Sequence, residues 1–219
     1  AQGLPTCIYR PGMVTGHHQT GISNPDDLMC RFLGSFVQLK CAPDLDLMID
    51  MTPVDYVGKA IVYLSRQQGS LGKAVHLVNP NPIGIDRLLH DLNRIGHSVN
   101  KVPYETWKTA IMTKENFLSP LKNIITEPVW GNLTRLEIWL SGNQVFDCSN
   151  TSIGLRDSGI ECPSIDRYLV EKYMTYISEH DMDNNKEISD LQENRTQVTP
   201  FAEIIKSLSG QKSLFATSR

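Results

Sequence analysis

The pattern of apolar and polar residues predicts alternating strands and helices over the first half of the chain. Segments that read as strands occupy residues 7–9, 47–51, 74–78 and 98–102. Between them, apolar residues recur at steps of three and four, the spacing of one buried helix face, over about residues 28–39, 54–64 and 85–95. Because strand–helix–strand succession is typical of a mostly parallel sheet, this pattern predicts an α/β fold.

Capping signals predict where three of these helices begin or end. Asn24 precedes a proline and two aspartates, so Asn24 is predicted to be the N-cap of the first helix. Thr52 precedes another proline, and Asp55 lies three residues after Thr52, which predicts a capping box at the second helix. Gly96 is predicted to end the third helix in a left-handed conformation.

From residue 103 onward the pattern becomes mainly helical. Residues 103–140 read mostly as helix and contain the three tryptophans, which we expect to cover the core of this region. A short strand is predicted at residues 144–147. A clear amphipathic helix is predicted at residues 165–177, where apolar residues recur every four positions.

The composition changes again after residue 180. Residues 181–194 are polar and charged, so we predict a solvated linker, because so few apolar residues cannot offset the entropy of ordering the chain. Residues 200–208 predict one short helix with an apolar side. We therefore predict three parts: a first domain at residues 1–82, a mainly helical region at residues 83–180, and a partly disordered C-terminal segment at residues 181–219.

Composition narrows the class of protein. The chain has 219 residues, of which 40% are hydrophobic, and a net charge of −3, which suits one sizeable core and offers no basic run for nucleic acid or a membrane surface. No apolar run could span a bilayer, and no signal peptide opens the chain. Five cysteines without a CxxC pair favour a reducing cytoplasm over disulfides or a zinc site. The chain lacks an initiator methionine, so we expect a piece of a longer protein.

The stretch from Cys7 to Gly21 carries the strongest functional signal. A short apolar run ends at Arg-Pro-Gly and continues into a polar loop with glycines at 12, 16 and 21. In open α/β sheets, ligands bind beyond the carboxyl ends of the strands. Pro11 would restrict φ, and Gly12 would let the backbone approach a flat ligand. An ordinary strand-to-helix loop explains this stretch alone equally well.

Several segments together resemble one family. They are Ile8–Gly12, Gly16–His17, Gln19–Gly21, Asn24, Asp27, Asp50–Val57, His76–Pro80, Phe146–Thr151, Leu155 and Cys162–Pro163. In order and spacing they resemble the thioester reductase domains of nonribosomal peptide and polyketide synthetases and of aminoadipate and carboxylic acid reductases. These domains are extended short-chain dehydrogenase/reductases (SDRs). The resemblance covers about residues 1–180. It implies the C-terminal part of a Rossmann-like extended SDR fold with a smaller, mainly helical substrate-binding subdomain.

The resemblance also implies an activity and a set of site residues. In the family, NADPH reduces an acyl or peptidyl thioester, held on the phosphopantetheine arm of a carrier protein, to an aldehyde or an alcohol. The residues implied to face the cofactor are Arg10, Pro11, Gly12, Met13 and Val14. Those implied to line the substrate channel are His17, Gln19, Thr20, Asn24 and Tyr56. Tyr56 is also compatible with a place in the core, and Trp107 with contact to an acyl chain.

The family's catalytic machinery is missing from this sequence. Nothing reads G-x-x-G-x-x-G after a strand, and the family's catalytic Thr/Ser, Tyr and Lys precede the Arg-Pro-Gly strand. Tyr104 and Lys108 form a Tyr-x-x-x-Lys motif more than ninety residues after that strand, so we reject them as catalytic. No catalytic residue is therefore predicted. The chain is expected to be inactive alone, to bind NADPH weakly, and to need the N-terminal half of the domain or a self-association partner at an exposed sheet edge.

The remaining polar residues have plainer interpretations. His17 and His18 are adjacent, so they cannot both face one ligand from a regular element, and no metal site is predicted. Asp26, Asp27 and Asp55 are read as charges at helix N-termini rather than acid–base groups. Asp50 is compatible with either role.

Two other functions stay open at this point. One is a non-catalytic module that binds a carrier protein or another protein chain. The other is a fragment of a different extended reductase, such as a nucleotide-sugar epimerase or dehydratase. The missing phosphate loop favours a fragment or a binding module, whereas the segment Asp50–Val57 favours the thioester reductases over the sugar enzymes.

Overall fold

A computed structural model describes residues 6–141 and 146–194, with backbone alone for 181–194. The chain divides into two compact units, Ala1–Ser178 and Glu179–Arg219, and the fold below is that of the first. The predicted helix at 200–208 lies outside the described residues, as do residues 144 and 145 of the predicted strand at 144–147. Residues 146 and 147 are described and are not in a strand, so the prediction is wrong for them.

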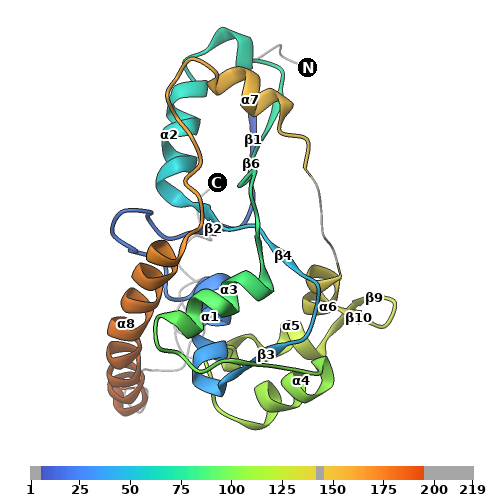
Figure 1. Ribbon diagram of the computed structural model, residues 1–219, viewed down its shortest axis with the longest axis vertical. Helices are drawn as coiled ribbons and strands as arrows, with labels where there is room; N and C mark the ends of the chain where they lie inside the picture. The colour runs from blue at the N-terminus through green and yellow to red at the C-terminus, as the bar shows by residue number, and fades with distance from the viewer. Residues whose placement is uncertain (1–5, 142–145, 195–219) are drawn as a thin grey trace, which may run out of the picture. The chain divides into compact units, whose positions relative to one another are not determined.

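One part of the first unit is a two-stranded parallel sheet covered by a helix (Figure 1). Strand β1 (Ile8–Pro11) pairs with β6 (Ala74–Leu77), and helix α2 (Val54–Leu64) packs against them. Alternate strand residues point toward the helix because side chains alternate along a strand. The buried residues of this core are Tyr56, Val57, Ala60, Leu64, Val75, Leu77 and Leu155.

The two edges of this sheet differ. At β6, helix α7 (Ser149–Leu155) supplies side chains to the outward carbonyls: Asn150 Nδ2 donates to Ala74 O at 2.9 Å, and Thr151 Oγ1 donates to His76 O at 2.5 Å. At β1, no strand in the described part of the chain pairs with the outer edge. The predicted exposed sheet edge is therefore confirmed at β1.

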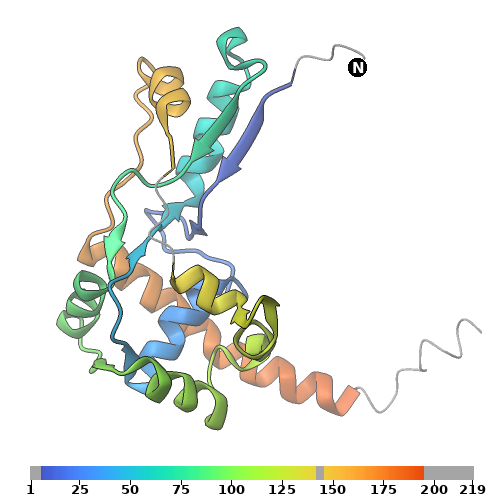
Figure 2. The ribbon, with the colours of Figure 1, turned by 90° about the vertical axis from the view of Figure 1, so that its right-hand side faces the viewer.

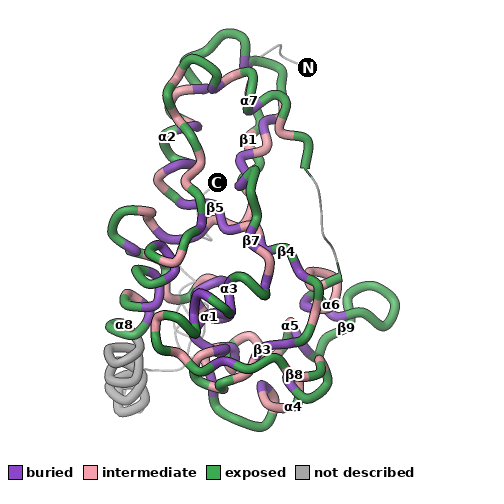
Figure 3. The backbone as a smooth tube through the Cα atoms, viewed as in Figure 1, coloured by how far each residue is buried: buried purple, intermediate pink, exposed green. Residues whose placement is uncertain are grey.

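A larger core lies among the helices of the second part (Figure 2). Its helices are α1 (Leu28–Leu39), α3 (Ile85–Arg94), α4 (Tyr104–Thr113), α5 (Lys122–Thr126), α6 (Arg135–Leu140) and α8 (Arg167–Asn194). Figure 3 shows buried stretches on α1 and α3. Trp107 is fully buried and packs against the rings of Phe32 and Phe36, with centroid separations of 5.9 and 6.1 Å.

Short strands and turns join these parts. The parallel pairs are β2 (Val14–Thr15) with β5 (Thr52–Pro53) and β3 (Cys41–Pro43) with β8 (Asn100–Val102). The antiparallel pairs are β4 (Met48–Ile49) with β7 (Ile83–Gly84) and β9 (Pro128–Trp130) with β10 (Leu133–Thr134). Two 3₁₀ turns are η1 (Gln68–Ser70) and η2 (Ser119–Leu121).

The predicted alternation is confirmed, but both predicted N-caps are wrong. Helix α1 begins one turn later than predicted, with Asp27 as its N-cap accepting from Cys30 N, because Asn24 Oδ1 instead caps the amide of Asp26 in a preceding turn. Helix α2 has no side-chain cap. The Asp55 carboxylate accepts from the His18 amide, and Thr52 Oγ1 donates to Asp50, so the predicted capping box does not form.

Two helix ends also bear on the predictions. Gly96 has φ +103° directly after α3, which confirms it as the helix stop. Helix α8 begins near the predicted start but continues to Asn194, through the segment predicted as a linker. A polar composition predicts that a helix has no apolar face to bury, but it does not exclude the helix itself.

Candidate functional site

The carboxyl ends of β1 and β6 are held together by one carboxylate. Asp50 Oδ2 accepts from the amide of Met13 at 3.1 Å, directly after β1. Asp50 Oδ1 accepts from the amide of Asn79 at 3.0 Å, just after β6, and from Thr52 Oγ1 at 2.7 Å. The sequence left Asp50 open between a charge at a helix N-terminus and an acid–base group. In the structure both of its oxygens accept hydrogen bonds from neighbouring loops, so Asp50 holds these loops together.

Gly12 is required by the same carboxylate. A Cβ added to Gly12 would lie 1.8 Å from Asp50 Oδ2 and 2.9 Å from Val78 Cγ1. Its amide also donates to Leu77 O at 3.0 Å, which extends the β1–β6 ladder by one residue. Close approach by Asp50, rather than an unusual φ, is therefore what excludes a side chain at this position.

A cavity of about 440 Å³ opens beside this loop. Gly12, Met13 and Asp50 line it on the side of the loop after β1. Its other walls come from the β4 segment, helix α6 and the residue after the undescribed gap, namely Leu47, Met48, Arg135, Ile138, Trp139 and Phe146. A mostly apolar cleft with a few converging polar groups is the usual form of a small-molecule site.

The structure brings only two of the predicted cofactor-facing residues to this cavity, Gly12 and Met13. Arg10 and Pro11 are exposed on β1. Val14, in β2, packs against the core under the sheet. The Arg-Pro-Gly loop therefore presents its glycine and the following methionine to the cavity, and its arginine to another surface.

The predicted substrate-channel residues lie outside the cavity lining. Gln19 and Thr20 are exposed in a turn, where Gln19 N donates to His17 Nδ1 at 3.2 Å and Thr20 Oγ1 accepts from Ile22 N at 3.4 Å. Asn24 is an exposed turn residue. Tyr56 is only 5% exposed, and burial raises its pKa to about 12. Of its two predicted places, the structure shows the one in the core.

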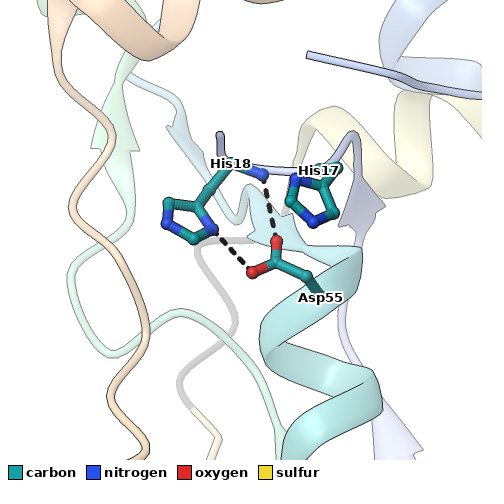
Figure 4. Close-up of side chains that lie close together, drawn as sticks. All are labelled: His17, His18 and Asp55. Carbon is teal, nitrogen blue, oxygen red and sulfur yellow. Dashed lines mark hydrogen bonds and ion pairs between the residues drawn. The ribbon is translucent and has the colours of Figure 1, made fainter. Parts of the chain in front are cut away.

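His17, His18 and Asp55 form a second polar cluster (Figure 4). The two imidazole rings stack with centroids 5.7 Å apart and planes 14° from parallel. Asp55 accepts from His18 N at 3.0 Å and from His18 Nδ1 at 2.6 Å, and from Lys59 Nζ at 3.1 Å. Although burial opposes its ionisation, these hydrogen bonds lower the pKa of Asp55 to about 2. The argument that adjacent histidines cannot face one ligand applies to a regular element, whereas His17 and His18 lie outside any helix or strand and their rings stack.

The loop that carries this cluster is anchored on α8. Tyr173 OH donates to Gly16 O at 2.8 Å and lies 3.1 Å from Thr15 Oγ1, and burial raises the pKa of this phenol. Gly21 has φ +76°, and a Cβ there would lie 2.5 Å from the carbonyl of Lys172. The loop therefore packs directly against the helix backbone.

The rejected Tyr-x-x-x-Lys motif joins two helices. Tyr104 OH donates to Glu137 Oε1 at 3.3 Å, and Lys108 Nζ donates to the same oxygen at 2.8 Å. Glu137 also completes the capping box of α6 with Thr134. Burial and the nearby Glu137 raise the pKa of Tyr104. Both motif residues are thus engaged in holding α4 to α6.

The cavity residues that sequence reasoning missed come from the β4 segment, from α6 and from Phe146. Arg135, Ile138 and Trp139 line the cavity, whereas Trp107, which was considered for contact with an acyl chain, is fully buried. The tryptophans offered a partial signal, since one of three lines the cavity. Nothing in the sequence placed α6 opposite Met13, because that contact joins residues more than a hundred positions apart.

Comparisons with known proteins agree on one family. Residues 1–61 match an NAD-binding family model described as male sterility protein. The chain is 33% identical over 184 residues to the non-canonical nonribosomal peptide synthetase FrzA of a Cladobotryum species, and 31% identical over 188 residues to the aldehyde reductase lnaA of Aspergillus flavus. Each alignment covers 80% of this chain but only 18% of the relative.

Solved structures extend the match to the fold. The terminal R domain from the myxalamid PKS-NRPS biosynthetic pathway is 34% identical, with a TM-score of 0.70, over 81% of this chain and 45% of that one. The resemblance to the reductase domains of nonribosomal peptide synthetases is confirmed. A thiolation-reductase di-domain from an archaeal non-ribosomal peptide synthetase shares the fold at 18% identity and a TM-score of 0.62.

The reductase-domain likeness confirms the predicted fold class, part of an extended SDR with a mainly helical subdomain. This chain spans less than half of each of the two R-domain structures and less than a fifth of the two curated relatives. Over the described residues, no helix is both long and apolar enough to cross a membrane.

Proposed function

We propose that this chain forms the nicotinamide-side and substrate-side part of an NADPH-dependent thioester reductase. The observation that carries the proposal is the cavity between the Gly12–Met13 loop and helix α6. It lies beyond the carboxyl ends of parallel strands, where open α/β sheets bind their ligands. The family resemblance and the related aldehyde reductase support reduction as the reaction class.

The residues of the cavity fit one end of a dinucleotide better than the other. Met13, Ile138 and Trp139 offer apolar surface to a flat ring or an acyl chain. A diphosphate needs backbone amides at a helix N-terminus, and the sequence contains no glycine-rich loop of that kind. When bound, the cofactor would supply the hydride. This chain would supply the wall that orients the acceptor carbon and excludes water.

The two halves of the first unit then have separate tasks. The β1–β6 sheet with α2 and α7 would complete a Rossmann-like domain. The larger helical core would form the substrate-binding subdomain, and it includes α1 and β4 from residues 1–82 as well as helices from residues 83–180. Asp50 is a positioning residue, because its carboxylate accepts hydrogen bonds from the Met13 amide, the Asn79 amide and Thr52 Oγ1. The missing phosphate loop and proton donor would come from the N-terminal half of the domain, so the chain alone is inactive.

The proposed substrate is an acyl or peptidyl chain on the phosphopantetheine arm of a carrier protein, with an aldehyde or alcohol as product. Support comes from the relative that is a nonribosomal peptide synthetase and from the structural match to a thiolation-reductase di-domain. A mostly apolar cavity suits an acyl chain. The preference for NADPH over NADH is carried by the family resemblance.

The test is NADPH oxidation with an acyl-pantetheine thioester. We expect no turnover by the 219-residue chain and turnover once it is joined to the N-terminal half of its reductase domain. In that longer protein, Trp139→Ala should raise KM for the thioester about tenfold with little change in kcat, because it removes apolar contact made before and during reaction. Ile124→Ala, a change in the same subdomain outside the cavity lining, is the matched control.

A non-catalytic carrier-binding module is the main competing function. It predicts that the longer protein binds a carrier protein but never oxidises NADPH with any thioester. Absence of turnover despite measurable NADPH binding by the longer protein would therefore contradict the reductase proposal.

A further inference from the structure

The His17–His18–Asp55 cluster carries chemistry that reduction does not use. It offers two imidazole nitrogens and one carboxylate oxygen, and these atoms all lie within 4.8 Å of one another. Figure 4 shows the two rings beside the Asp55 carboxylate at the start of α2. The three residues come from two segments nearly forty positions apart, so the fold and not the local sequence brings them together.

Two nitrogens and one oxygen form a donor set that suits a divalent transition metal. Imidazole favours zinc, copper and nickel, whereas magnesium and calcium prefer oxygen ligands. Bonds of about 2.0–2.1 Å to zinc place tetrahedral ligand atoms roughly 3.3 Å apart. The present spread therefore needs only side-chain rotation in a half-exposed turn, with no change in the fold.

The neighbouring contacts show how the ion would enter. His18 Nδ1 lies 2.6 Å from Asp55 Oδ2, and a metal ion would replace this hydrogen bond as the link between the two side chains. Lys59 Nζ, at 3.1 Å from the same carboxylate, opposes a second positive charge. Because the Lys59 side chain is 58% exposed, it can move into water when the ion binds.

We propose that His17, His18 and Asp55 bind a zinc ion with three protein ligands and one position open to water. The ion would join the turn after β2 to the first turn of α2. That turn already rests on α8 through Tyr173, so the site would fasten the loop that follows the Arg-Pro-Gly segment at both of its sides. The proposal is independent of the reductase activity, because binding alone tests it.

The experiment is calorimetric titration of the 219-residue chain with zinc chloride, with magnesium chloride as the oxygen-preferring control. We expect one zinc site per chain. His17→Ala, His18→Ala and Asp55→Asn should each weaken zinc binding about tenfold or more. His90→Ala removes an exposed histidine of α3 and should leave binding unchanged. Far-UV circular dichroism checks that each variant retains its helices.

A fourth variant separates a metal site from a purely structural cluster. Lys59→Gln keeps a polar side chain at this position and removes the competing charge, so it should tighten zinc binding several-fold. Cobalt offers an independent readout, since its visible absorption on binding should be lost in His17→Ala. This variant should leave the fold intact, because the His17 side chain bonds the Gln19 amide and stacks on His18, while the backbone hydrogen bonds of His17 to Ile22 and Gly21 are retained.

Two results would overturn the proposal. The first is no zinc binding up to about 0.1 mM. The second is equal binding by the unaltered chain and by His17→Ala and His18→Ala, which would place the ion elsewhere.

Discussion

Asp50 and Gly12 show how tightly single residues are coupled at the loop after β1. The Asp50 carboxylate occupies the space where any side chain at position 12 would lie, and it satisfies the amides of Met13 and Asn79. Glycine and carboxylate therefore depend on each other. The loop holds its position beside the cavity without strained backbone, because Gly12 is not among the residues with positive φ.

We predict that Gly12→Ala destabilises the protein by about 2 kcal/mol or more, since the new methyl group must displace the Asp50 carboxylate from its hydrogen bonds. Gly58→Ala is the matched control. Gly58 lies inside α2 with nothing within 4 Å of an added Cβ, so alanine there should stabilise by about 0.5–1 kcal/mol. Urea unfolding measures both changes. If Gly12→Ala does not lower the free energy of unfolding, the Asp50 carboxylate moves freely to make room for the methyl group.

Tyr104 is the residue at which a sequence motif and its surroundings disagree most. Its hydroxyl is engaged with Glu137 and lies on α4, in the helical core. We predict that Tyr104→Phe leaves the turnover of the longer protein within a few-fold of wild type. Steady-state NADPH oxidation measures this. A loss on the order of a thousandfold, the scale for an essential proton donor, would contradict the structural role.

At the scale of elements, Glu137 both caps helix α6 and joins it to helix α4. Glu137 closes the capping box with Thr134 and receives Lys108 and Tyr104 from α4. Because α6 also carries Arg135, Ile138 and Trp139, the cap and the ion pair position one wall of the cavity. The wall is thus held by polar contacts at its start.

These contacts predict a pH dependence. The Lys108 ammonium and the Thr134 amide lower the pKa of Glu137 to about 2 from the ordinary value of 4.5. A lowered folded-state pKa means that this stabilisation is present above about pH 4.5 and is lost as the pH falls toward about 2. Glu137→Gln keeps the capping geometry but not the charge, so it should cost on the order of 1 kcal/mol at pH 7.

Thermal unfolding between pH 7 and pH 2 checks this. The difference between wild type and Glu137→Gln should shrink as the pH falls through that window. Glu105→Gln, on the exposed side of α4, should show a smaller difference. A constant gap between wild type and Glu137→Gln at all pH values would exclude the ionic contribution.

At the scale of the whole molecule, the small sheet is incomplete at β1. Ile8 N donates to Lys73 O and Gly12 N to Leu77 O, so alternate residues point toward β6 and the backbone of Tyr9 points outward. Ile8 itself is 54% exposed. An unpaired edge of this kind favours pairing with another strand.

We predict that the 219-residue chain self-associates in a concentration-dependent way through β1. Ile8→Lys should shift it toward the monomer, because a charge on an edge strand opposes edge-to-edge pairing. Val62→Lys is the matched control, since Val62 is also 54% exposed but lies on α2. Sedimentation velocity measures both. A monomer at all concentrations, or dissociation by Val62→Lys instead, would argue against the β1 edge.

Local patterns predicted the elements well and their ends less well. The apolar spacing of α1, α2 and α3 survives in the structure because those residues face a core. The predicted caps at Asn24 and Thr52 failed because each side chain found a nearer donor or acceptor, within a turn for Asn24 and at Asp50 for Thr52. Capping preferences describe a helix end without other contacts. These two helix ends lie in loops, where other hydrogen-bond partners compete for the capping side chains.

What the sequence determined by itself was the family, the order of elements and the Pro11–Gly12 loop, because each depends on neighbouring residues or on motifs in linear order. Only the tertiary structure decided that Asp50 joins two strand ends, that α6 faces Met13, and that Asp55 meets two histidines. Each of those contacts joins residues 29 or more positions apart. No local periodicity records such a contact, since it forms only when separate elements pack into one core.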